Sequence, residues 1–174
     1  MSDKKVYTQG TLVTRSFPDR ESAERAYEDI RARGYESDEI HVIMSEDTRK
    51  RLAEKDAIKI EKGNKSFEGA GVGGALGGAV GATLLGIMAA GATVAVPGLP
   101  LVIAGPIAGA LAGGAAGATA GGLLGALIGL GIPEDRAKAY QVDLKNGGIV
   151  LGVRPRDDRD ARYFEDEWQR RPAY

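Results

Sequence analysis

A stretch without a charged side chain, from Gly69 to Pro133, constrains this chain more than any other feature of its sequence. The stretch is 65 residues long, lies between Glu68 and Glu134, and holds 20 of the 26 glycines. Glycine costs roughly 0.5–1 kcal/mol relative to alanine inside a helix. Glycines in regular helical spacing therefore need an explanation other than helix propensity.

The glycines of this stretch recur at every fourth position. One row of bulky residues accompanies them in the first half: Val72, Leu76, Val80, Leu84 and Met88. On a helix, small residues four apart form a groove that a second helix backbone can approach closely. The spacing predicts an assembly interface formed by the glycine rows: Gly69, Gly73, Gly77 and Gly81 in the first half, and Gly105, Gly109, Gly113, Gly117, Gly121, Gly125 and Gly129 in the second.

Two prolines divide the stretch in its middle. Val96-Pro97-Gly98-Leu99-Pro100 is a turn signal, because proline stops a helix and Gly98 tolerates a positive φ. The pattern predicts two helices of roughly 24 residues, each about 36 Å long, folded into a hairpin over residues 67–132. A helix of that length is sufficient to cross a hydrocarbon core of about 30 Å.

The charged sequence before the hairpin predicts half of an α/β domain. Thr11–Phe17 and Ile40–Met44 are strand patterns. Between them lies a helix with Asp19 as its N-cap and Gly34 just past its end. A strand–helix–strand unit of this kind implies parallel strands.

Two further segments lead from this half into the hairpin. Asp47–Lys55 is typical of a short charged helix, and Ala57–Glu61 alternates as an edge strand would. Residues 63–66 are expected to be a linker.

The sequence after the hairpin predicts the other half of the domain. Pro133 followed by Glu134 and Asp135 begins a helix, and Ile149–Val153 is a strand. We therefore expect an α+β fold, a ferredoxin-like split β-α-β domain with an inserted glycine-zipper two-helix hairpin. Its parts are residues 1–66 and 133–154 as the two halves of the domain, residues 67–132 as the hairpin, and residues 155–174 as a charged C-terminal tail.

The tail can form an amphipathic helix over Asp157–Arg171. Ala161, Phe164 and Trp168 then share one side of it. The sequence leaves open whether this helix is solvated or docked on a partner.

Composition excludes several classes of function. With 23 Lys and Arg against 24 Asp and Glu, no basic surface for nucleic acid is expected. The chain has no cysteine, which excludes disulfides and thiol chemistry. No apolar core follows the polar N-terminus, so no secretion signal is expected.

Residues that could carry catalysis are few. His41 is the only histidine and alternates with apolar neighbours, as a structural or solvent-facing residue of a strand would. The Gly69–Gly74 segment contains a G-x-G motif, but a dinucleotide fingerprint follows a strand and has an acid about 20 residues later. Here a polar linker precedes it and the next acid is Glu134. We expect no catalytic, cofactor-binding or metal-binding residues, no cofactor, and no enzymatic activity.

The order of these elements resembles the bacterial general stress proteins of the YflT, heat-induced type. The likeness covers roughly residues 10–153 and includes the βαβ opening, the Gly/Ala hairpin, the GIPEDRAKAY helix start and the GGIVLGV strand. The resemblance implies a role in stress responses and carries over no catalytic residue. The tail after Arg154 has no counterpart in it.

These observations predict a non-enzymatic, stress-associated protein that self-assembles as a homo-oligomer. The hairpin is expected in the cytoplasmic membrane, in contact with lipid and with the α/β domain facing the cytosol. The flanking cations agree with the positive-inside rule: Lys59, Lys62, Lys65, Arg136 and Lys138.

Three alternatives remain open at this point. The hairpins can pack on one another inside a soluble homo-oligomer or filament in the cytoplasm, since so large an apolar surface is rarely left wet. The ferredoxin-like domain can instead be a ligand-binding module that the hairpin only tethers. A ring of hairpins around a pore would have few polar lining residues, namely Thr83, Thr93 and Thr119.

Overall fold

The protein has an α+β fold, described here from a computed structural model over residues 12–63, 92–94, 101–105 and 115–170. One five-stranded antiparallel sheet has the order β1-β5-β2-β4-β3. The strands are β1 (Val13–Phe17), β2 (Ile40–Ser45), β3 (Ala92–Val94), β4 (Leu101–Ala104) and β5 (Ile149–Val153). The helices are α1 (Arg20–Ala32), α2 (Glu46–Gly63), α5 (Ala115–Gly129), α6 (Glu134–Lys145) and α7 (Asp158–Arg170), with a 3-10 turn η1 (Ser37–Glu39).

The last strand in the sequence occupies the centre of the sheet. β5 pairs antiparallel with β1, where Phe17 lies opposite Ile149, and with β2, where Ile40 lies opposite Val153. Two strands that are both antiparallel to β5 run parallel to each other. The predicted β-α-β unit is therefore present in its split form, with β5 between its two parallel strands.

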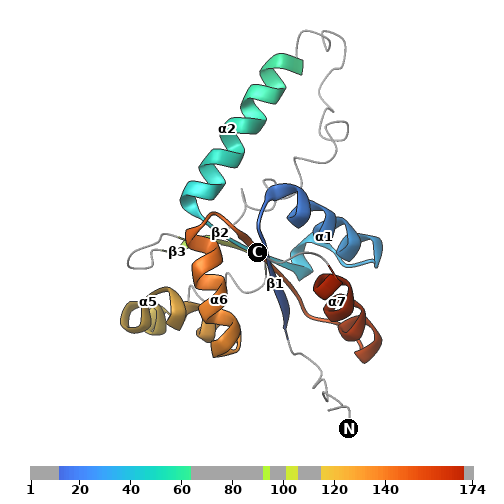
Figure 1. The fold of residues 1–174 in the computed structure, drawn as a ribbon, viewed down its shortest axis with the longest axis vertical. Helices are drawn as coiled ribbons and strands as arrows, with labels where there is room; N and C mark the ends of the chain where they lie inside the picture. The colour runs from blue at the N-terminus through green and yellow to red at the C-terminus, as the bar shows by residue number, and fades with distance from the viewer. Residues whose placement is uncertain (1–11, 64–91, 95–100, 106–114, 171–174) are drawn as a thin grey trace.

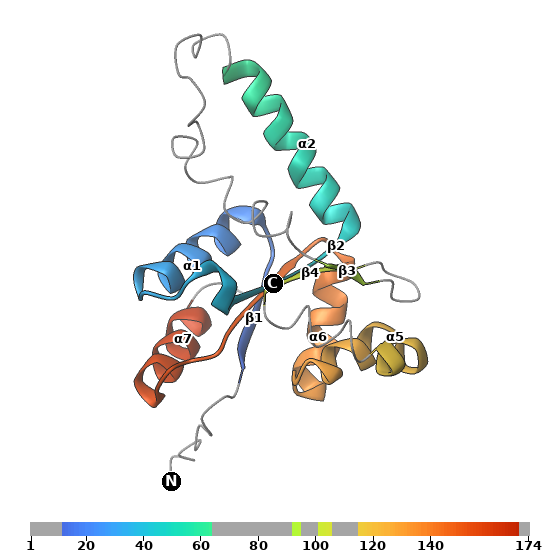
Figure 2. The same cartoon turned by 180° about the vertical axis from the view of Figure 1, so that it is seen from behind.

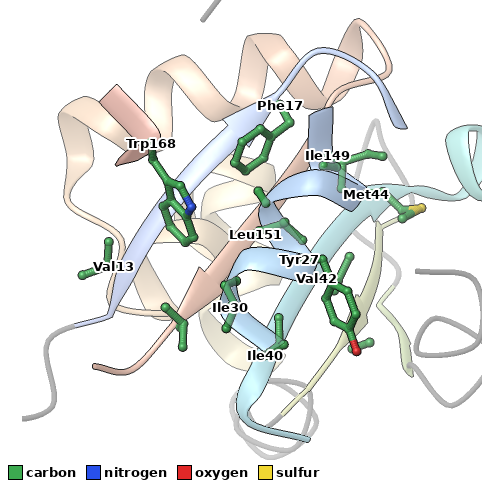
Figure 3. Packing of buried hydrophobic residues seen from close by; sticks show 14 of the residues in the cluster. Val13, Phe17, Tyr27, Ile30, Ile40, Val42, Met44, Ile149, Leu151 and Trp168 are labelled. Atoms are coloured by element: carbon green, nitrogen blue, oxygen red, sulfur yellow. The ribbon is translucent and has the colours of Figure 1, made fainter. Parts of the chain in front are cut away.

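Helices cover both faces of the sheet, as Figures 1 and 2 show from opposite sides. α1 and α7 lie over one face and α5 and α6 over the other. Alternation along β2 divides its residues between the two layers, since Val42 joins the first core and Ile43 the second. Figure 3 shows the first core, which packs side chains of α1 and α7 onto β1, β5 and β2.

The first helix forms as its sequence predicts. The side chain of Asp19 accepts a hydrogen bond of 2.8 Å from the backbone N–H of Ser22, which confirms the N-cap. Gly34 has φ +83° just past the helix, as a C-terminal glycine should. Ala23, Tyr27 and Ile30 form the buried stripe.

The sequence following β2 differs from its prediction. Ala57–Glu61 is not an edge strand, because it continues α2 as far as Gly63. The charged residues around it are good helix formers, and helix continuation competes successfully with the short alternating pattern. α2 starts on the sheet, where it packs against β2 and β4, and then projects away from it (Figure 1).

The prediction of the second hairpin helix is wrong over its first residues. Leu101–Ala104 follows Pro100 as strand β4, which pairs with β2 through Ile43 opposite Ile103. The segment is a run of β-branched and aliphatic residues, and burial on both sides in the sheet suits such a run better than a helix does. α5 begins only at Ala115. The end of the predicted first helix is wrong too, since Ala92–Val94 is strand β3, and the rest of that helix lies outside the described residues.

Among the helices that the structure describes, none has the length and apolar character required to cross a membrane.

The C-terminal segment is part of the domain. The predicted amphipathic helix is confirmed as α7, and Ala161, Phe164 and Trp168 are buried in the core that α1 shares. The hydroxyl of Tyr35 donates a 2.7 Å hydrogen bond to Asp160, and burial together with this bond raises the pKa of Tyr35 to about 12. A tail docked on the chain's own sheet replaces the two alternatives left by the sequence.

Candidate functional site at the edge of β1

The predicted assembly glycines do not share one helix in the described part of the chain. Gly105 ends β4 with φ +94°, and a Cβ there would lie 2.2 Å from the carbonyl oxygen of Ile40. It is therefore a strand-end glycine required by close backbone packing, not the start of a helical row. The remaining first members of the rows lie outside the described residues: Gly69, Gly73, Gly77, Gly81, Gly109 and Gly113.

The later glycines of the second row belong to α5. Gly117 and Gly121 precede a break in this helix at Gly122, which has φ +58° and ψ −151°. Gly125 and Gly129 follow the break. A continuous groove along all seven positions is therefore wrong. The part of α5 after the break packs on the sheet through Leu123, Ala126 and Leu127.

A groove of about 390 Å³ lies at the edge of the sheet, beside β1. One wall comes from α6 and the other from α7, so the groove opens where the two helix layers meet the edge strand. Its lining residues are Val13, Thr14, Arg15 and Ser16 of β1, Arg136, Ala139, Tyr140 and Asp143 of α6, and Glu165 and Trp168 of α7. The volume falls in the range of small-ligand sites.

Polar side chains of α6 fix its position over the edge strand. The Tyr140 hydroxyl donates to the Thr14 carbonyl oxygen at 2.7 Å and lies 3.2 Å from the Thr14 hydroxyl. Ser16 Oγ donates to the Asp143 carboxylate. Tyr140 thus satisfies a carbonyl of β1, an edge strand of the sheet. Burial raises the pKa of Tyr140, so this hydroxyl stays protonated as a donor at neutral pH.

Charged side chains line the groove between the two helices. Nη2 of Arg136 on α6 lies 4.0 Å from Oε1 of Glu165 on α7, a weak ion pair at the limit of direct contact. Arg15 adds a second guanidinium from β1. Burial lowers the pKa of Arg15 from its ordinary value, which means that its cation has lost part of its hydration.

Trp168 forms the apolar end of this lining. Its ring packs edge-on against Phe17, at 6.0 Å between centroids, and at a tilt of 40° against Phe164, at 5.6 Å. Figure 3 labels Trp168 and Phe17. The side chain is buried, and its indole N–H finds no acceptor among the residues described here. An unpaired buried N–H costs about 1–3 kcal/mol. Such a donor is an uncommon feature that calls for an explanation.

His41 lies away from the groove, on β2 opposite Gly152. It is 1% exposed, and burial lowers its pKa to about 4, with a smaller contribution from the charge of Arg154. The imidazole is neutral at pH 7. The expectation of a structural histidine holds, while a solvent-facing one is wrong. The described ranges contain no group of three or more His, Cys, Asp or Glu side chains placed to hold a metal ion.

The sequence predictions missed the groove because its residues come from three distant elements. The sequence places Trp168 only on one side of an amphipathic helix. The available signal was the polar alternation in β1, where Thr14 and Ser16 take inward positions that an apolar core would fill with aliphatic side chains. Buried polar residues on a strand indicate polar partners on the helix that covers them.

Comparisons of the chain with protein-family models, with curated protein sequences and with solved structures find no match.

Proposed function

We propose that this is a non-enzymatic, stress-associated protein that self-assembles through its Gly/Ala segment, with the α/β domain as a charged head. The stress association rests on the resemblance to the general stress proteins. The observation that carries the assembly is the charge-free sequence over residues 69–91, where Gly69, Gly73, Gly77 and Gly81 retain their four-residue spacing. The described strands and helices resume only after this part of the stretch, at Ala92.

The two ends of this segment restrict how it can meet a membrane. α2 precedes it and packs at its start on β2 and β4, while β3 follows it in the same sheet. The segment must therefore leave and rejoin one body on the same side. Two equal arms would have roughly 11 residues each, about 17 Å as helices, against a hydrocarbon core of about 30 Å. The membrane form of this proposal is thus a shallow insertion, with the domain on the cytosolic side.

A soluble assembly is the other location that this proposal allows. Apolar surface removed from water contributes about 25 cal/mol per Å², a driving force that is missing between helices already inside lipid. Small residues in helical rows suit contacts between copies in either solvent. The attachment of both ends to one body favours the soluble form. Helical arms of about 11 residues are too short to span a bilayer, but they can still pack against the arms of a second copy.

We also propose that the sheet and α1 form a ferredoxin-like core. The parallel strands β1 and β2 with β5 between them support a ferredoxin-like core. α6 covers the face opposite to α1, which departs from a layer of helices on one face only.

Replacement of Gly77 by leucine tests the assembly. A side chain in the middle of the first row should block close approach, and light scattering of the full-length protein should show a smaller species. Gly117→Leu, in α5, measures what the second row contributes. If Gly77→Leu leaves the particle mass unchanged with and without detergent, self-assembly through this row is rejected. Carbonate extraction of cell membranes then separates the two locations, since only an inserted protein stays in the pellet.

A ligand-binding domain is the second candidate function, and the groove beside β1 favours it. Under this alternative the Gly/Ala segment only tethers the domain. Replacing residues 67–91 by a short Gly-Ser linker leaves β3, β4 and α5 in place. That variant should keep ligand binding and lose assembly.

A further inference from the structure

One side of α6 lines the groove beside β1 and carries opposite charges at its two ends. Arg136, Ala139, Tyr140 and Asp143 all belong to the lining. Residues spaced in this way, at i, i+3, i+4 and i+7, share one side of a helix. Arg136 and Asp143 are therefore about 10 Å apart along the helix axis, at a rise of about 1.5 Å per residue. Only the small side chain of Ala139 and the ring of Tyr140 lie between them.

Two contacts with β1 show how the strand runs beside this side of α6. Tyr140 donates a hydrogen bond to the carbonyl of Thr14, and Ser16 donates one to the carboxylate of Asp143. The order of residues along the strand thus matches their order along the helix. The groove has Asp143 at the end beside Ser16, and Arg136 at the end towards the start of β1. A ligand extended along β1 would pass from one charge to the other.

Both of these charges can take a further partner. Among the described residues, Arg136 pairs with Glu165 alone, and the separation of 4.0 Å is too long for a hydrogen bond. Glu165 has an interaction besides this pair, so a ligand on Arg136 would not leave that carboxylate without a partner. Asp143 accepts from Ser16 through Oδ2. A carboxylate has about four acceptor positions on its two oxygens, which leaves room for a second donor.

The lining as a whole balances its charges. Its two arginines are matched by two carboxylates: Arg15 and Arg136 against Asp143 and Glu165. A simple anion or a simple cation would meet a charge of its own sign in such a groove, whereas a molecule with one charge of each sign can match both ends. The volume of about 390 Å³ has room for a short hydrocarbon chain between those charges.

We propose that this groove binds a short linear zwitterion along β1, with its carboxylate on Arg136, its ammonium on Asp143 and a hydrocarbon chain between them. Arginine pairs with carboxylates in a bidentate geometry. The ammonium has three N–H donors, which suit the remaining acceptor positions of Asp143. This inference rests on the second candidate function, ligand binding in the groove, and is independent of self-assembly.

Calorimetric titration of the full-length protein with 6-aminohexanoate tests the proposal. Norleucine is the matched probe, because it is an isomer with the same two charges held next to each other at one end. Hexanoate and hexylamine each carry only one of the charges. We expect saturable binding of 6-aminohexanoate at millimolar or lower concentration. Each of the other three probes should bind about tenfold more weakly, because it loses one charged contact.

Two variants assign the two ends of the ligand. Asp143→Asn removes the charge, while its amide oxygen can still accept from Ser16. This variant should bind 6-aminohexanoate no better than hexanoate. Arg136→Gln should bind it no better than hexylamine. A general loss of structure would weaken all probes alike and would not produce this pattern. Arg159→Gln, on α7 with 83% of its side chain accessible, is the control and should leave binding unchanged.

Equal affinities of 6-aminohexanoate and norleucine would overturn the proposal and leave ligand binding in the groove intact. An unchanged preference for 6-aminohexanoate in both Asp143→Asn and Arg136→Gln would overturn it too. Absence of heat with all four probes at two temperatures would reject the site. Light scattering of the same samples reports assembly independently, so a loss of assembly with binding intact rejects the first proposed function alone.

Discussion

The two faces of the sheet differ in the side chains that their cores bury. The face under α1 and α7 is packed with aromatic side chains: Phe17, Tyr27, Tyr35, Phe164 and Trp168. The face under α5 and α6 is almost entirely aliphatic, with Leu127 and Leu144 among its buried residues and Tyr140 as its aromatic member. Both faces bury their core residues nearly completely.

The helices also differ in whether their sequences mark a buried and an exposed side. α1 and α7 are rich in charge, so each apolar residue stands out and can face only the sheet. α5 has no charged residue at all. No charge marks its buried side: Leu123 and Leu127 lie in the core, whereas the equally large Ile128 is 41% exposed. The orientation of a charged helix on the sheet thus follows from its own sequence pattern. The orientation of the charge-free α5 depends on the residues of the sheet that it packs against.

Truncation of one core residue on each face should have the largest effect. Phe164→Ala should lower the free energy of unfolding by about 3–5 kcal/mol, and Leu127→Ala by about 2–5 kcal/mol, since both side chains are fully buried. Urea denaturation followed by circular dichroism measures both. A loss below 1 kcal/mol for Phe164→Ala would mean that α7 does not belong to the core, and the same result for Leu127→Ala would place α5 outside it.

Part of the fold could be predicted from the sequence. Strands β1, β2 and β5 and helices α1 and α7 followed from alternation, caps and amphipathic spacing, with Asp19 and Gly34 at the predicted ends of α1. The hairpin prediction failed at Leu101–Ala104, because a short aliphatic run is compatible with either a helix or a strand. The groove depends on residues of β1, α6 and α7 that only the packing brings together.

Acid should weaken the fold through His41, which is buried in the sheet. The folded-state pKa of His41 is about 4, against an ordinary value of 6.5. Because the unfolded state binds the proton first, stability is complete above pH 6.5 and falls as the pH is lowered towards 4. The loss over this window should reach about 3 kcal/mol. Denaturation midpoints at pH 7 and pH 4.5 measure it. His41→Gln should remove this part of the pH dependence, and an unchanged dependence would contradict the assignment.

The glycines of the second half provide the next test. Gly105→Ala should cost about 2–3 kcal/mol, because φ is +94° and the new Cβ would lie 2.2 Å from the Ile40 carbonyl oxygen. Gly131→Ala is a matched control, since its φ is +84° but nothing lies within 4 Å of the added atom. Backbone strain alone, about 1 kcal/mol, is expected there. Thermal melts of the two variants should differ, and equal values would show that the close approach at Gly105 is unimportant.

The smallest effect concerns the aromatic face. Asp19→Ala removes the side chain that accepts from Ser22 N and should cost about 1 kcal/mol. Asp38→Ala, at an exposed acid of η1 close in sequence, is the control for loss of charge alone. Chemical denaturation can resolve this difference. If both variants lose the same stability, α1 is positioned by its packing and the cap is dispensable.

The central place of β5 affects the order in which the chain can fold during its synthesis. β1 and β2 leave the ribosome early, yet the strand that joins them follows roughly a hundred residues later, at 5–20 residues per second. During those seconds the two strands face an empty position, and the Gly/Ala segment has already been synthesised. The apolar rows of the sequence are therefore complete before the last strand of the head domain exists. Under the proposed self-assembly, contacts between neighbouring chains on one messenger RNA would begin during translation, before the charged head is completed.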